Sequence, residues 1–193
     1  MKAFGAGTAN TRGKNRVAQN TFYGPFAAAV LACGLLTGVQ QDKPASPQKP
    51  AQTETQHQGV VERGDHEMGF SHDKTAHHFR LYADGGTIEA DARDAQDTAS
   101  RDAIRSHFAH IAKLFAAGDF EIPMLIHAQN PPGAETMKRL REAIEYKLEN
   151  TERGGRIRIT TKNREALQAV HSFLRFQISD HQTGDSPEIS DAT

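Results

Sequence analysis

Histidine is the residue type in this chain that could most readily do chemistry. The sequence of 193 residues contains ten histidines, and several stand close together between residues 66 and 78. Neutral imidazole is the commonest protein ligand for transition metals, and its pKa lies near neutrality, so clustered histidines indicate metal binding or proton transfer. The clustering names neither a substrate nor a reaction, because a single histidine is more often a surface or core residue than a ligand.

Five histidines are the candidate ligands of a metal site. His107 and His110 are three residues apart on an expected helix, which places them on one face. His77 is expected to point inward from a strand, whereas His66 and His127 belong to flanking segments that could approach it. We predict that at least three of these five imidazoles lie within about 8 Å of one another, near enough for small shifts to close a coordination sphere.

The neighbouring residue types limit which metal such a site would take. Met68 and Met124 add thioether sulfur, and a mixture of histidine and methionine favours copper. Histidine with carboxylates would instead favour zinc, iron or nickel, and haem is a further candidate cofactor. His57 and His181 are expected to be solvated, and His171 is expected to be a hydrogen-bonded core residue.

No catalytic motif is found in the sequence. A nucleophile elbow and a phosphate-binding loop are both missing. A metal-dependent enzyme would need a base beside the ion, and Glu67, Asp73 and Asp102 are the candidates. The alternative is an interaction or ligand-sensing domain without metal, in which Phe173 and Phe176 form a partner surface and could join two copies of the chain.

The charge composition argues against nucleic acid as a partner. The formal net charge is −1, there is no tryptophan, and basic residues are interspersed with acidic ones. A nucleic-acid interface needs a basic patch or stripe, so we expect no nucleic-acid partner.

Residues 1–33 have the order of features expected of an export signal. Basic residues precede an apolar stretch that ends at Cys33, the only cysteine. Val30-Leu31-Ala32-Cys33 resembles a lipobox, so Cys33 is the predicted lipidation site, and a signal cut elsewhere or an uncleaved anchor are the alternatives. Residues 34–58 are rich in Gln and Pro and are predicted to form a flexible tether. These features predict a bacterial cell-envelope protein, anchored to the membrane by lipid and facing the periplasm or the exterior.

The folded domain is expected to span residues 59–184, followed by a disordered tail at 185–193, and it carries a weak internal repeat. Each half reads as a strand, a Gly-Gly turn, a strand and a helix, with turns at Gly85-Gly86 and Gly154-Gly155 whose glycines supply positive φ. Apolar and charged residues alternate along the strands, as in a sheet with one solvated face. The sequence therefore predicts an α+β fold, in which two β-β-α units form a roughly four-stranded antiparallel sheet with helices on one face.

Apolar periodicity predicts two long helices. The first is expected over residues 100–117 with Thr98 or Ser100 as its cap, and Asn163 is the predicted cap of the second. Between the two units, residues 124–127 are predicted to form a short strand. The two core stripes are Ile104, Phe108, Ile111 and Phe115, and then Leu167, Val170, His171, Leu174 and Ile178.

A series of short motifs is spread over the folded part. They are Met68-Gly69-Phe70, His77-His78-Phe79, Arg101-Asp102-Ala103-Ile104-Arg105 with His107 and His110, Gly118-Asp119-Phe120, Pro123-Met124 with His127, and Phe173-Leu174-Arg175-Phe176-Gln177-Ile178 with Asp180-His181. This pattern resembles a family of small exported bacterial proteins of unestablished biochemistry. The resemblance implies one coherent exported domain and brings no activity with it.

Overall fold

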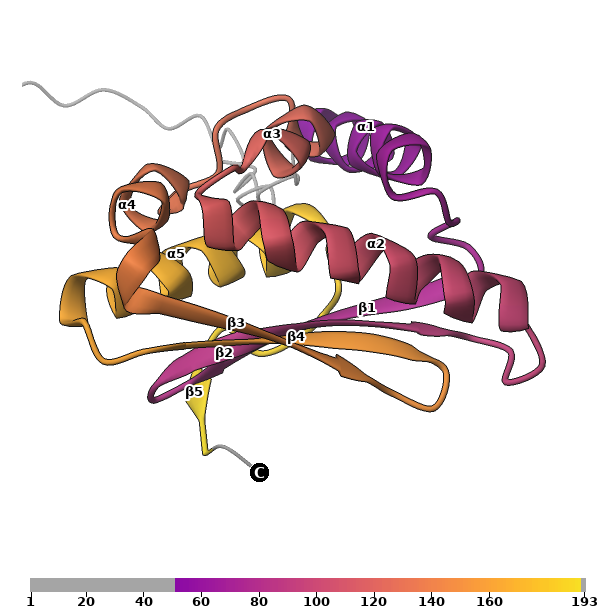
Figure 1. The fold of residues 1–193 in the computed structure, drawn as a ribbon. Helices are drawn as coiled ribbons and strands as arrows, with labels where there is room; N and C mark the ends of the chain where they lie inside the picture. Colours follow the sequence, from indigo (N-terminus) through magenta and orange to yellow (C-terminus); the bar gives the residue numbers. More distant parts are fainter. Residues whose placement is uncertain (1–50, 192–193) are drawn as a thin grey trace, which may run out of the picture. The chain divides into compact units, whose positions relative to one another are not determined.

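Two β-hairpins, each followed by a long helix, form the framework of the protein (Figure 1). The structure is a computed structural model that describes residues 51–191, with side chains from residue 54 onward. The helices are α1 (Ala51–Met68), α2 (Thr98–Ala117), α3 (Glu121–His127), α4 (Ala134–Arg139) and α5 (Arg164–Asp180), with a 3-10 turn at Arg141–Ala143. The strands are β1 (Thr75–Tyr82), β2 (Gly85–Ala92), β3 (Ile144–Asn150), β4 (Gly154–Thr161) and β5 (Ile189–Ser190).

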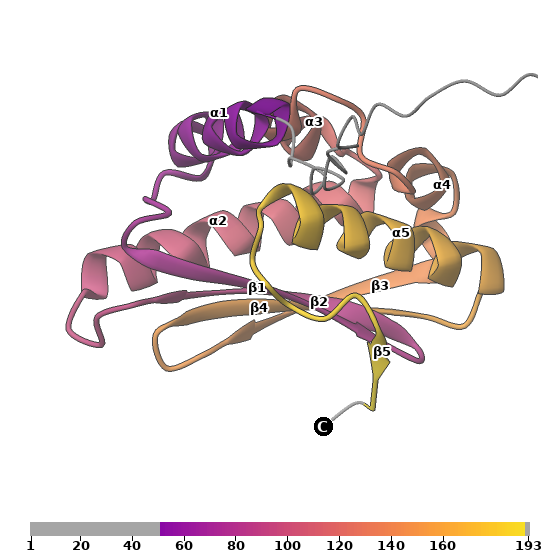
Figure 2. The same ribbon diagram turned by 180° about the vertical axis from the view of Figure 1, so that it is seen from behind.

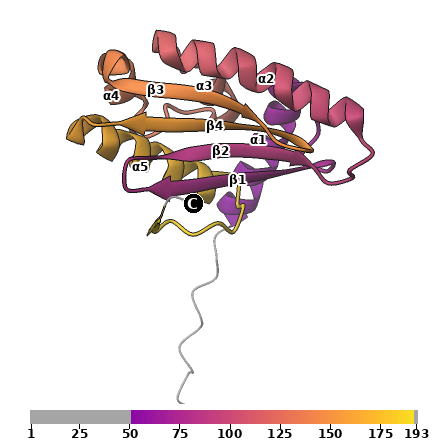
Figure 3. The same ribbon diagram turned by 60° about the horizontal axis from the view of Figure 1, so that its bottom comes forward.

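The sheet has the order β3-β4-β2-β1-β5, and its four long strands pair antiparallel (Figure 3). The two hairpins meet where β2 pairs with β4, from Gly85 opposite Thr160 to Asp91 opposite Gly154. The predicted α+β class is therefore confirmed. The difference is β5, a two-residue strand that pairs parallel with β1 and lies in the predicted disordered tail.

The hairpin glycines are needed mainly because backbones approach closely there. Only Gly85 of the four has a positive φ, at 150°. A Cβ on Gly86 would lie 2.4 Å from the Arg80 carbonyl oxygen, and one on Gly154 would lie 2.0 Å from that of Ala90. The predicted positive φ is thus wrong at Gly86, Gly154 and Gly155. At Gly86 and Gly154 the absence of a side chain lets a neighbouring backbone approach, whereas a Cβ on Gly155 would make only ordinary contact, 3.5 Å from Phe108 Cδ2.

The two long helices cover one face of the sheet and bury the predicted stripes against it, except for Leu167, which is half-buried (Figure 2). Ile104, Phe108, Ile111 and Phe115 are all buried, and α2 packs chiefly on β3 and β4 while α5 packs on β1 and β2. Asn163 caps α5 as predicted, with its Oδ1 accepting from the N–H groups of Glu165 and Ala166. The cap of α2 is Asp97 instead of Thr98 or Ser100, because its carboxylate accepts from the Ser100 N–H.

The segment predicted as a short strand at residues 124–127 is the helix α3. Pro123, Ile126 and His127 are its buried residues, so the burial follows helical spacing. The strand prediction was wrong because so short an apolar run cannot be assigned to a strand or a helix by its period alone. Asp119 Oδ1 accepts from the Glu121 N–H at the start, and Ala128 adopts a left-handed conformation at the end.

Helix α1 adds a further layer beyond the predicted domain boundary. It begins at Ala51, inside the predicted 34–58 tether, and it packs mainly on α3. Gln56 Nε2 donates to the His127 carbonyl at 3.2 Å, and Arg63 Nε donates to the Ile126 carbonyl at 2.8 Å. Val60 of α1 is fully buried. The composition of the predicted tether does not indicate this apolar burial.

Phe173 belongs to the core. Its ring centroid lies 5.9 Å from those of both Phe115 and Phe120, and the residue is 1% exposed. Phe176 is half-buried against His127, with ring centroids 4.8 Å apart. The predicted partner surface is therefore wrong for Phe173, and homodimer formation stays a prediction.

Truncating Phe108 or Leu174 to Ala should lower the free energy of unfolding by about 2–5 kcal/mol, because each replacement leaves a cavity in a packed core. Phe108 is 3% exposed and Leu174 is fully buried. Urea denaturation measures the loss, and Leu125→Ala is the matched control, since Leu125 is 45% exposed. A loss from Leu174→Ala no larger than that of the control would contradict the described core.

Candidate functional site

Three imidazoles form a cluster at one end of the helical layer. The ring centroids of His72 and His77 lie 4.8 Å apart, those of His72 and His181 lie 5.6 Å apart, and those of His77 and His181 lie 5.8 Å apart. The ring planes are inclined to one another by only 19–29°. We call His72, His77 and His181 the imidazole cluster.

Three different elements deliver the rings of the imidazole cluster. His72 lies in the loop after α1, His77 is on the covered face of β1, and His181 is the C-cap residue of α5. Asp65 of α1 holds His72, since its Oδ1 lies 2.9 Å from the His72 backbone nitrogen and 2.6 Å from Nδ1. Gly64 makes room for this ring, because a Cβ there would lie 2.6 Å from His72 Cε1.

Each ring of the cluster has a buried nitrogen without a hydrogen-bond partner. These atoms are His72 Nε2, His77 Nε2 and His181 Nδ1. A buried polar group without a partner costs on the order of 1–3 kcal/mol, so proteins rarely gather several at one place. Such a concentration indicates that the nitrogens are kept available for a ligand.

The cluster is electrostatically suited to neutral rings. Burial lowers the pKa of His77 to about 3, with His72 and His107 as further causes. Burial also holds the pKa of His181 well below its usual value, and the neighbouring His77 and His127 lower it further. His107 has its pKa lowered to about 4, again chiefly by burial. These imidazoles are therefore uncharged at neutral pH, which is the form that binds metals.

His127 borders the cluster but is already engaged at both ring nitrogens. Its Nδ1 lies 2.5 Å from Asp180 Oδ2, and its Nε2 lies 2.8 Å from the side-chain oxygen of Gln177. Neither ring nitrogen of His127 is therefore without a partner for a ligand to take.

The imidazole cluster separates a surface groove from a small cavity. The groove, of about 370 Å³, is bordered by all three cluster rings together with His57, His78 and Asp73. The cavity, of about 60 Å³, is lined mainly by apolar side chains, with His77 and His181 among its walls. Ligands could thus reach the rings from the groove, while the other side of the cluster lies against core residues.

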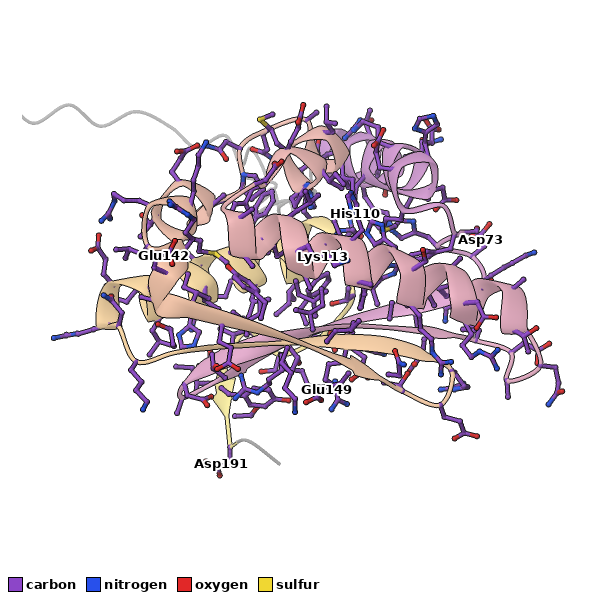
Figure 4. The ribbon with its side chains drawn as sticks, viewed as in Figure 1. Asp73, His110, Lys113, Glu142, Glu149 and Asp191 are labelled. Atoms are coloured by element: carbon purple, nitrogen blue, oxygen red, sulfur yellow. The ribbon has the colours of Figure 1, made fainter. Side chains whose placement is uncertain are left out.

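The structure brings three of the five histidines predicted as ligands, His77, His107 and His127, to the walls of one cavity, and it places the other two elsewhere. His66 is exposed and bonds to Glu67, and His110 is exposed on α2 (Figure 4). His107 is half-buried, with its ring centroid 5.6 Å from that of Phe70. His77, His107 and His127 border the same cavity, but only His77 belongs to the imidazole cluster.

Two members of the cluster, His72 and His181, are not among the five predicted ligands. His181 was expected to be solvated, yet it continues the α5 stripe at the spacing 171, 174, 178, 181, and this signal could have found it. His72 has no comparable local signal, because its position depends on Gly64 and Asp65 of the docked α1. His171 is the expected core residue, with Nε2 2.9 Å from the Tyr82 carbonyl oxygen.

As they stand, no three histidine, cysteine or carboxylate side chains among residues 54–191 are arranged as a group that could hold a metal ion. Of the predicted bases, Asp73 borders the groove, whereas Glu67 bonds to His66 and Asp102 pairs with Arg101 on exposed helix surface. Cys33, the predicted lipidation site, lies outside the described residues.

The lowered pKa values of His77 and His107 should make the ligand-free domain less stable in mild acid. Below about pH 6.5 the unfolded chain takes up protons on these rings, while the folded chain does not until about pH 3 and about pH 4. The free energy of unfolding should therefore fall as the pH falls from 6.5 to 4, by up to about 1.4 kcal/mol per pH unit for each ring. Urea titrations at several pH values measure this slope. His107→Gln should flatten it and exposed His66→Gln should not, and a flat profile for the unaltered protein would refute the expectation.

Comparisons with protein-family models, with curated proteins and with solved structures found no match to this chain. Within residues 51–191, no helix combines the length and the apolar character needed to cross a membrane. The resemblance to small exported bacterial proteins stays a prediction from the sequence.

Proposed function

We propose that the domain binds a transition-metal ion through His72, His77 and His181. One observation carries the proposal: three imidazoles with centroids 4.8–5.8 Å apart each have a buried nitrogen without a partner. Two imidazoles on one ion, with metal–nitrogen bonds of about 2 Å, have ring centres roughly 5 Å apart. The rings are thus already spaced as ligands, and they would have to turn in place for their nitrogens to converge.

The surroundings of the cluster support a metal ligand over a structural role. Asp65 contacts His72 Nδ1, which leaves Nε2 for a metal, and a carboxylate in this position commonly orients a metal-binding histidine. The groove with Asp73 at its border gives an ion a route from solvent. Rings less than 6 Å apart leave no room for a porphyrin between them, so the proposal is for an ion instead of haem.

Titration of untagged protein with zinc, nickel and copper tests the proposal. The unaltered protein should bind one ion, and His77→Gln or His181→Gln should weaken binding roughly 10- to 100-fold because each removes one of three ligands. Calorimetry and elemental analysis measure the affinity and the metal content. His66→Gln and His110→Gln are matched controls, since both side chains are exposed and outside the cluster. Absence of binding would favour the alternative of an interaction or ligand-sensing domain without metal.

The location of the protein is proposed from its leader alone. We infer that residues 1–33 export the chain and that lipid on Cys33 anchors it in the bacterial envelope, so that the metal site faces the periplasm or the exterior.

Full-length protein expressed in a diderm bacterium should fractionate with membranes, because a lipidated cysteine and its acyl chains partition into the bilayer. Cys33→Ala should release the protein or leave an unprocessed precursor, as seen by immunoblotting of fractions and by mass spectrometry of the N-terminus. Equal partitioning and identical mass processing of both forms would contradict lipidation.

A further inference from the structure

Met68 places a thioether beside the imidazole cluster. It is the last residue of α1 and is 8% exposed. A Cβ on Gly64 would lie 3.2 Å from the Met68 methyl carbon, 2.6 Å from His72 Cε1 and 3.5 Å from His72 Nε2. The Met68 methyl carbon and the edge of His72 that carries the unpartnered nitrogen therefore both lie within 3.5 Å of this one position.

The same methionine lines the small cavity that the other two members of the cluster, His77 and His181, also line. One thioether and the unpartnered nitrogens of three imidazoles thus gather around one region between α1, β1 and α5.

Three of the nearby carboxylates are engaged elsewhere, and the fourth, Asp73, borders the groove and is not a wall of the cavity that Met68 lines. Asp65 bonds to His72 Nδ1, Asp180 bonds to His127, and Asp185 bonds to His78 and to the Phe79 N–H. A divalent ion buried at the cluster would gain no anionic ligand from these groups, and the charge of a buried ion must be compensated by its ligands. A monovalent ion would be buried at a smaller electrostatic cost.

From this arrangement we propose that the ion is Cu(I), held by His72, His77, His181 and the sulfur of Met68. This inference rests on the metal function proposed above and names the ion. Thioether sulfur is a soft ligand that selects Cu(I), and neutral imidazoles suit copper as well as zinc. The apolar walls of the cavity favour the lower charge of the cuprous ion.

Competition for Cu(I) under anaerobic conditions tests the ion and its sulfur ligand. The untagged full-length protein should take Cu(I) from the chromogenic chelator bicinchoninate, and Met68→Leu should weaken Cu(I) binding about tenfold or more while changing Zn(II) affinity less than about twofold. Leucine keeps the volume and apolar character of methionine, so the packing of α1 should persist. Met137→Leu is the matched control, because Met137 is fully buried on α4 and is not a wall of the cavity.

X-ray absorption at the copper edge gives a second readout that packing alone would not change. The unaltered protein and Met137→Leu should show one sulfur neighbour of copper, and Met68→Leu should show none. Equal Cu(I) affinity of Met68→Leu with only nitrogen neighbours in every form would overturn the sulfur ligand and leave the metal function standing. Failure of the unaltered protein to bind Cu(I), Zn(II) or Ni(II) would overturn the metal function itself.

Discussion

The pairing of β2 with β4 is the constraint on which the rest of the structure depends. It joins two β-β-α units that would otherwise be separate hairpins, and each long helix packs chiefly on the hairpin of the other unit. An isolated two-stranded hairpin has too little buried surface to persist in water, so neither unit is complete without the other. Residues from both hairpins, such as Ile88 and Ile157, face each other across this central pair. The covered face that results carries His77 of β1, whose ring lies beside that of His181 at the end of α5.

The imidazole cluster gathers three of the buried side-chain atoms in residues 54–191 that have no hydrogen-bond partner, and other such atoms belong to Arg63, Thr87 and Tyr146. His171 on the same helix α5 shows the ordinary solution, because its ring contacts the carbonyl oxygens of Tyr82 and Gly85. His72, His77 and His181 instead retain nitrogens without partners, and burial together with the neighbouring imidazoles lowers the pKa of His77 and His181. Each buried nitrogen without a partner lowers the stability of the fold. Such a loss of stability is expected where a site is held ready for a ligand.

Local sequence patterns predicted the hairpins and the two long helices because those elements depend on near neighbours. The Asn163 cap and the stripe from Ile104 to Phe115 are examples. The sequence patterns failed for elements whose conformation or burial depends on residues that are distant in the sequence. Four apolar residues at α3 have no period of their own, and α1 gains its burial from α3 and α5. The candidate site shows the same limit, since the sequence indicated His77 through its expected inward direction on a strand, whereas His72 and His181 are joined to it only by the folded arrangement of α1 and α5.

The contacts of α1 also determine when the imidazole cluster can form during biosynthesis. Gln56 and His57 contact Asp180, which follows them in the sequence by 124 and 123 residues. Synthesis proceeds from the N-terminus, so Asp65 and His72 are made long before their neighbours at the far end of α5. Partial chains that end before His181 lack one of the three rings altogether. The imidazole cluster is thus completed last, when the end of α5 has left the ribosome, and a ligand that needs all three rings cannot be enclosed before then.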